Sequence, residues 1–186
     1  MMKHITNFIY ELGQLKRIKH EGWRLIGVEN PESVADHTTR AAQIAFILAN
    51  LENYKNPYEV CTLVVFHDIG ETRVGDIHKV ANSYIKVEEE KAVEDQTSKL
   101  NEIGKEILKI WKESENRNTL AGEIARDADL LEQAFTAKEL IEIGHEKAQD
   151  WINNVTKALK TESAKRLLKE LQEINSTDWF DGLKKL

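Results

Sequence analysis

A helix built from residues 58–68, YEVCTLVVFHD, would be apolar around most of its circumference. A helix of that kind is buried on all sides, so this segment is predicted to be the central helix of an all-α protein. Gly70 and Gly75 follow closely and are predicted to end the helical pattern near Asp68. His67 and Asp68 are therefore expected together at the end of the most buried helix. An unpaired carboxylate is costly in such a place.

A second helix is predicted to begin at a capping box. Residues 33–36, Ser-Val-Ala-Asp, have the Ser-x-x-acid pattern, and Pro31 just upstream favours entry into a helix. The helix should run to about Leu51, with an apolar stripe made of Val34, Ala41, Ile44, Ala45 and Leu48. At about 100° per residue, His37 lies within that stripe. One histidine is thus predicted to point toward the core.

The rest of the chain also has helical periodicity. A late helix is predicted from Leu120 to about Gly144, with Asp127 and Asp129 on either side of its apolar face. A first helix is expected before a loop at residues 22–31, and further helices are expected within and after residues 84–113. Their apolar residues include Phe8, Leu12, Leu15, Trp111, Trp151, Leu167, Leu168 and Leu171. No repeat or linker interrupts the pattern, so residues 1–186 are predicted to form a single-domain helical bundle.

The composition narrows the class of protein. Hydrophobic residues make up 41% and charged residues 31% of the 186, with only 2 Pro, which is typical of a helix-rich globular protein. Cys61 is the only cysteine, which excludes a disulfide framework and a cysteine-rich zinc site. The formal net charge of -6 disfavours nonspecific binding to nucleic acid or an anionic membrane. No signal peptide or membrane-spanning stretch is evident, so we expect a cytoplasmic protein.

The buried polar residues indicate a metal site. His37, His67 and Asp68 supply nitrogen and oxygen ligands, and Asp127 and Asp129 follow later in the chain. A lone core histidine is more often a hydrogen-bonded structural residue, but a buried Asp beside a buried His needs a cation, a donor network or protonation. One divalent cation would satisfy all of these groups. Imidazole and carboxylate accept several metals, so the ligands do not name the ion.

Several short motifs occur in order along residues 12–136. They are Gly22-Trp23, Pro31-Glu32-Ser33-Val34-Ala35-Asp36-His37, His67-Asp68-Ile69-Gly70-Glu71, Gly75-Asp76-Ile77 and Asp127-Ala128-Asp129-Leu130. In this order and spacing they resemble the HD-domain phosphohydrolases of the 5′-deoxynucleotidase type. His-Asp alone would be a weak motif, whereas the combination is a specific signature.

This resemblance implies a helical bundle around one divalent metal, bound by His37, His67, Asp68 and a late aspartate. The family pattern Ala-Asp-x-Leu puts the fourth ligand at Asp129. Helical geometry alone leaves Asp127 an almost equal candidate, and we assign it a supporting role behind the ligands. The implied activity releases phosphate from deoxyribonucleoside 5′-monophosphates. The implied metal is Co²⁺ or Mn²⁺, or else Mg²⁺, Zn²⁺ or Ni²⁺, and the implied assembly is a homodimer.

The resemblance also implies roles in catalysis and substrate binding. Glu71, four residues after His67, would act as general acid or base if the helix continued that far. Asp76 would contact the sugar hydroxyl, and Trp23 would line the nucleotide pocket. Without the motif, each has an ordinary reading: a solvated glutamate, a helix N-cap and a core aromatic.

The sequence departs from the family pattern where relatives have an arginine just before the tryptophan. Residues 19–22 here are Lys-His-Glu-Gly, so the cation that holds the phosphate is open. The candidates are Arg24, Arg40 and Lys79, with Arg40 one helical turn after His37. Each of them could instead be a solvated surface charge.

Two alternatives remain at this stage. HD proteins also hydrolyse cyclic nucleotides, nucleoside triphosphates and guanosine tetraphosphate, and the resemblance alone does not choose among these substrates. A noncatalytic helical scaffold stabilised by a metal is the other alternative. Nucleic-acid binding is disfavoured because basic residues are interspersed with acidic ones.

Overall fold

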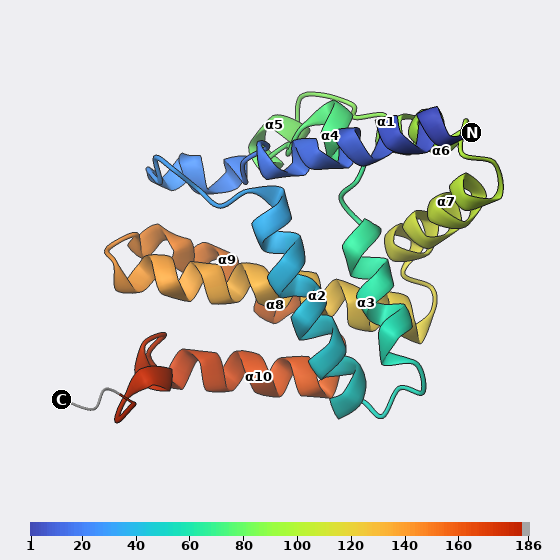
Figure 1. Cartoon of the computed structure of the whole chain (residues 1–186). Coiled ribbons are helices and arrows are strands. Elements are labelled where there is room, and N and C mark those ends of the chain that lie inside the picture. Colours follow the sequence, from blue (N-terminus) through green and yellow to red (C-terminus); the bar gives the residue numbers. More distant parts are fainter. Residues whose placement is uncertain (184–186) are drawn as a thin grey trace.

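The computed structural model describes residues 1–183 and builds them from helices and turns (Figure 1). No β-strand occurs among these residues, although Lys19 and Ser33 form an isolated antiparallel bridge. The prediction of an all-α fold is therefore confirmed. The α-helices are α1 Met2–Leu12, α2 Val34–Leu51, α3 Pro57–Phe66, α4 Glu71–Val74, α5 Lys79–Asn82, α6 Glu89–Thr97, α7 Asn101–Asn116, α8 Leu120–Glu142, α9 Gln149–Ala158 and α10 Glu162–Glu173. The 3₁₀ helices are η1 Gly13–Lys16, η2 Glu21–Ile26, η3 Glu146–Ala148 and η4 Asp178–Phe180.

The core lies where α2, α3 and α8 pack against one another. Helix α2 crosses α8, and α3 lies beside both (Figure 1). Their contact surfaces are fully buried aliphatic side chains, among them Leu48, Leu63, Val64, Ile124 and Leu131. Burying such side chains stabilises the folded state by about 1.5–3 kcal/mol each. The predicted metal ligands thus lie on, or directly after, the three helices that form this core.

The predicted capping box at the start of α2 is confirmed. The Ser33 hydroxyl accepts a hydrogen bond from the Asp36 backbone N–H at 3.2 Å. The Asp36 carboxylate accepts one from the Ser33 backbone N–H at 2.9 Å. These bonds define where the helix begins, and the side chain of His37, only 1% exposed, follows within the first turn.

Helix α3 ends earlier than expected. It begins with Pro57 at its first turn and stops at Phe66, and His67 to Gly70 form turns before α4 begins at Glu71. Glu71 is therefore not on a continuation of the central helix, as its spacing from His67 suggested. Helix α6 packs so closely here that a Cβ on Gly70 would lie 2.4 Å from Cγ of Glu89.

The segment predicted as a loop at residues 22–31 contains the 3₁₀ helix η2. Its end is set by Gly27, whose φ of 85° is in the left-handed region that favours glycine. Trp23 on η2 is buried, so this segment contributes to the core. Among the described residues, no helix is long and apolar enough to span a membrane.

Candidate metal centre

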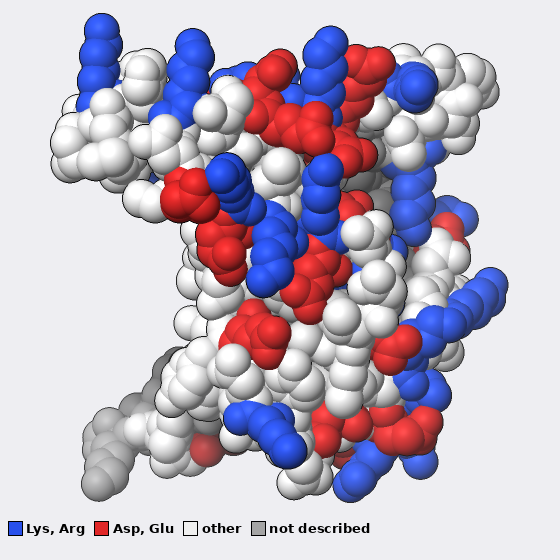
Figure 2. Space-filling view, turned by 90° about the vertical axis from the view of Figure 1, so that its right-hand side faces the viewer, with Lys and Arg blue, Asp and Glu red and all other residues white. Residues whose placement is uncertain are grey.

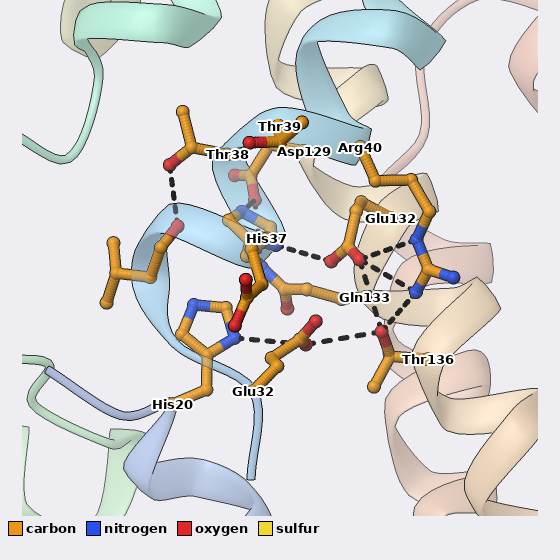
Figure 3. Close-up of polar contacts among 12 residues, drawn as sticks. His20, Glu32, His37, Thr38, Thr39, Arg40, Asp129, Glu132, Gln133 and Thr136 are labelled. Carbon is orange, nitrogen blue, oxygen red and sulfur yellow. Dashed lines mark hydrogen bonds and ion pairs between the residues drawn. The ribbon is translucent and has the colours of Figure 1, made fainter. Parts of the chain in front are cut away.

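Three separate elements bring the four predicted ligands together. His37 comes from α2, and His67 and Asp68 from the turn after α3; one ligand atom from each lies within 4.8 Å of the others. Asp129 comes from α8, and its Oδ1 atom lies 3.2 Å from Nε2 of His37 (Figure 3). These residues converge because α2, α3 and α8 pack as one core.

The Nδ1 atom of each of the two histidines lies against a hydrogen-bond acceptor. Nδ1 of His37 bonds the buried carboxylate of Glu132, and Nδ1 of His67 bonds the backbone carbonyl of Val64 at 2.6 Å. A carbonyl only accepts, so Nδ1 of His67 must donate. Each Nε2 then faces the cluster, which is the arrangement that metal-binding histidines usually show.

The electrostatics of the centre favour a cation. Burial alone would lower the pKa of both imidazoles, but neighbouring carboxylates outweigh it. Hydrogen bonds to Asp129 and Glu132 hold the pKa of His37 well above its usual value, and the charge of Asp68 raises the pKa of His67. Nε2 of His67 lies 3.0 Å from Oδ2 of Asp68. A lone pair facing a carboxylate at that distance is repelled, so a proton or a metal ion must lie between them.

The pKa values of the two aspartates are shifted in the opposite direction, downward. Burial opposes their ionisation, yet the charge of His67 lowers the pKa of Asp68. The Arg126 guanidinium, which forms a short ion pair with Asp129, keeps the pKa of Asp129 well below its usual value. Two neutral imidazoles and two carboxylates form a donor set that fits one divalent cation.

Asp127 has a different role from the one expected. Its carboxylate accepts hydrogen bonds from the backbone N–H groups of Lys160 and Thr161, at 3.1 and 2.7 Å, and from the Thr161 hydroxyl at 2.8 Å. Thr161 is the N-cap of α10, so Asp127 ties α8 to the loop between α9 and α10. These hydrogen bonds go to residues 160 and 161 and not to a metal ligand.

Glu71 is a half-buried residue near the centre. Its Oε2 atom has no hydrogen-bond partner among the described residues. Burial is the main cause that raises the pKa of Glu71 to about 10, and the charges of Asp68, Asp76 and Glu89 add to it. Glu89 was not singled out from the sequence, and burial together with the charge of Asp68 raises its pKa to about 7. Carboxyl groups whose pKa is raised this far by burial are typical of sites that act on a ligand.

A cavity of about 390 Å³ opens beside the metal centre. Its inner end includes Arg126 and Gln133, both of which bond Asp129. His20, Trp23 and Asp76 also line it, as does Lys79. The Asp76 carboxylate accepts a hydrogen bond from the Glu21 backbone N–H at 2.6 Å and so holds η2 against this cavity.

The two arginines proposed from the sequence for phosphate binding lie outside that cavity. Arg24 bonds the Glu29 carbonyl and the Glu21 carboxylate. Arg40 is held by Glu132 at 2.8 Å (Figure 3). It is also held by Glu139 at 2.7 Å. Both guanidinium groups are therefore held by partners that also lie outside this cavity.

Several residues of the site were assigned no role from the sequence. Glu132, which is completely buried, orients His37, and its only sequence signal is a charge three residues after Asp129 on a predicted helix. His20 and Glu32 lie beside His37: the His20 and His37 rings are 4.5 Å apart, and Nδ1 of His20 is 3.5 Å from Glu32 (Figure 3). His20, Glu32 and His37 form a second group with ligand-like spacing.

Comparison with known proteins places this geometry in a family. A model of the HD domain matches residues 12–174. The 5′-deoxynucleotidase HDDC2 of Homo sapiens is 29% identical over 95% of this chain and 88% of its own length. The HDDC2 enzyme of Dictyostelium discoideum is 33% identical over 74% of this chain and 78% of its own. A conserved hypothetical protein from Pyrococcus furiosus is 28% identical, with a TM-score of 0.78, over 91% of this chain and 99% of its own. The chain therefore belongs to the HD-domain family.

Proposed function

We propose that this protein is a metal-dependent phosphomonoesterase that hydrolyses deoxyribonucleoside 5′-monophosphates to a deoxynucleoside and phosphate. The observation that carries the proposal is the pair of imidazoles, each fixed at Nδ1 so that its Nε2 faces a carboxylate, that of Asp129 for His37 and that of Asp68 for His67. The similarity to relatives named 5′-deoxynucleotidase indicates the substrate. A cavity large enough for a nucleotide lies beside the centre.

In this proposal His37, His67, Asp68 and Asp129 hold one divalent cation. Such a cation polarises a phosphoryl oxygen and lowers the pKa of a bound water. Water attacks phosphorus, the bond to the 5′ oxygen breaks, and the proton lost by the water is matched by one gained at that oxygen. Glu71, whose buried Oε2 atom has no hydrogen-bond partner among the described residues, handles this transfer as general acid and base.

The substrate is held by the groups that line the cavity. Asp76 contacts the sugar hydroxyl, and Trp23 lines the nucleotide pocket. Arg126 takes the phosphate-binding role in place of Arg24 and Arg40, because it reaches both the cavity and Asp129. A cation at this position neutralises charge on the phosphoryl oxygens.

The test is phosphate release by the purified full chain loaded with Co²⁺, Mn²⁺ or Mg²⁺. Substrates are deoxynucleoside and ribonucleoside monophosphates, nucleoside triphosphates, cyclic nucleotides and guanosine tetraphosphate. The proposal expects the deoxynucleoside monophosphates to be hydrolysed best. No release from them, or faster hydrolysis of another class, would contradict it.

Glu71→Gln should lower kcat by at least about 100-fold, since general acid–base catalysis contributes 10²–10⁴-fold. Metal content and melting temperature should stay close to those of the wild type. The matched control is Glu88→Gln, because Glu88 is an exposed glutamate paired only with Lys91. Retained turnover in Glu71→Gln would refute the catalytic role of Glu71, whereas a noncatalytic metal-stabilised scaffold would release no phosphate even as the wild type.

We propose further that the chain works as one HD domain in a cytoplasmic homodimer, with Co²⁺ or Mn²⁺ as metal and no nucleic-acid partner. The exposed Trp179, 75% accessible, supports a contact between copies. Basic and acidic side chains are mixed on the face shown in Figure 2, which offers no basic stripe for a nucleic acid. Sedimentation of the purified protein tests the homodimer, and the electrophoretic mobility of a DNA duplex tests the absence of nucleic-acid binding.

A further inference from the structure

The cavity beside the metal centre has two chemically different ends. At the inner end, Arg126 and His20 offer positive or hydrogen-donating groups next to the metal ligands. The outer wall is formed by one face of α9. The α9 residues that line it are Asp150, Trp151, Asn154, Val155 and Ala158. None of these α9 residues is cationic, and Asp150 would repel a phosphate, so a phosphorylated ligand is oriented with its anion at the inner end.

The α9 wall has the chemistry of a platform for a flat heterocycle. Trp151 is half-buried, and its ring stacks on that of Trp23 with centroids 4.7 Å apart and an interplanar angle of 29°. The η2 backbone also packs near this ring, since a Cβ on Gly22 would be in ordinary van der Waals contact with Cζ2 of Trp151, at 3.4 Å. Leu130 from α8 adds an apolar side to the same cavity. An aromatic plane supported from behind is a suitable surface for stacking a base.

Asn154 gives this wall a polar edge. It lies three residues after Trp151 on α9, its side chain is exposed, and it lines the cavity. A carboxamide donates and accepts hydrogen bonds at once, as the edges of nucleobases do. A cavity of about 390 Å³ has room for a nucleotide extended from the metal centre to α9.

We infer that α9 is the nucleobase subsite: the base of the substrate stacks on Trp151, and Asn154 reads its edge. This inference rests on the proposed function for its ligand, a deoxynucleoside monophosphate. It assigns discrimination among bases to α9, whose Trp151 lies 80 residues after Glu71 and apart from every motif in the sequence.

The test compares nucleotides with 2-deoxyribose 5-phosphate, which has the same phosphate and sugar but no base. In Trp151→Ala, kcat/KM for dAMP should fall about tenfold or more, as expected for loss of one base–aromatic contact. The value for 2-deoxyribose 5-phosphate should stay near that of the wild type. In Asn154→Ala, the relative kcat/KM values for dAMP, dGMP, dCMP and TMP should change. Lys157→Ala, an exposed α9 position outside the cavity, is the matched control.

Calorimetric titration of the wild type and the variants with dAMP and with 2-deoxyribose 5-phosphate gives a readout that needs no turnover. The wild type should bind dAMP more tightly, and Trp151→Ala should abolish that difference. Trp151→Phe, which keeps an aromatic ring and the packing on Trp23, should retain most of it. Equal losses for both ligands, or an unchanged ranking of bases in Asn154→Ala, would overturn the inference. If the wild type releases no phosphate but prefers dAMP in this titration, the proposed activity fails and the subsite stands.

Discussion

At the scale of single residues, the two aspartates of α8 are only two positions apart on the helix and yet have unrelated functions. Asp129 lies against His37 and Arg126, whereas Asp127 accepts hydrogen bonds from residues 160 and 161. Side chains two positions apart on a helix point in nearly opposite directions, so only one of these two aspartates can face the metal centre. Substituting each in turn separates metal binding from stability.

Asp127→Ala should lower the free energy of unfolding by about 3 kcal/mol, because it leaves the backbone N–H donors of Lys160 and of the buried Thr161 without their charged acceptor. Its affinity for Mn²⁺ should not change. Asp129→Ala should lower the affinity for Mn²⁺ by more than roughly tenfold. Urea unfolding and calorimetric Mn²⁺ titration of both variants check this. Weakened Mn²⁺ binding in Asp127→Ala would contradict the assignment.

At the scale of one element, the capping box decides where α2 begins and hence where His37 lies. Ser33 is buried, and both its hydroxyl and its backbone N–H donate hydrogen bonds to the Asp36 carboxylate. Ser33→Ala should lower the free energy of unfolding by about 1 kcal/mol, the usual cost of losing an N-cap side chain. Thermal and urea unfolding measure it. A variant as stable as the wild type would show that packing alone holds this end of the helix.

The same capping box predicts a pH dependence. Hydrogen bonds from the Ser33 side chain and backbone hold the pKa of Asp36 below its usual 3.8. Since the pKa is depressed on folding, this stabilisation is complete above pH 3.8 and is lost as the pH falls through the lower pKa of the folded state. The stability difference between the wild type and Asp36→Ala should therefore shrink in that acidic range. Urea unfolding from pH 6 downward measures the difference, and a gap that widened with acidification would refute this account.

At the scale of the whole molecule, a bound metal would link α2, the turn after α3, and α8. Binding to the folded state alone stabilises it, by about 4 kcal/mol at a metal concentration 1,000 times the dissociation constant. Removing the metal with a chelator should therefore lower the melting temperature, and adding Mn²⁺ should restore it. Scanning calorimetry with and without chelator measures this shift. A melting temperature that does not respond to Mn²⁺ would show that these side chains do not share an ion.

The sequence by itself determined the helical class, the start of α2, the inward direction of His37 and the pairing of His67 with Asp68. These features depend on periodicity and capping, whose interactions span only a few residues. Only the tertiary structure showed that α3 stops at Phe66. It also showed that α6 packs closely against Gly70, in the turn that follows. It likewise separated Asp129 from Asp127 and brought Glu132 to His37, 95 residues away along the chain. Contacts between distant helices are set by how their side chains pack together, and no local pattern encodes that packing.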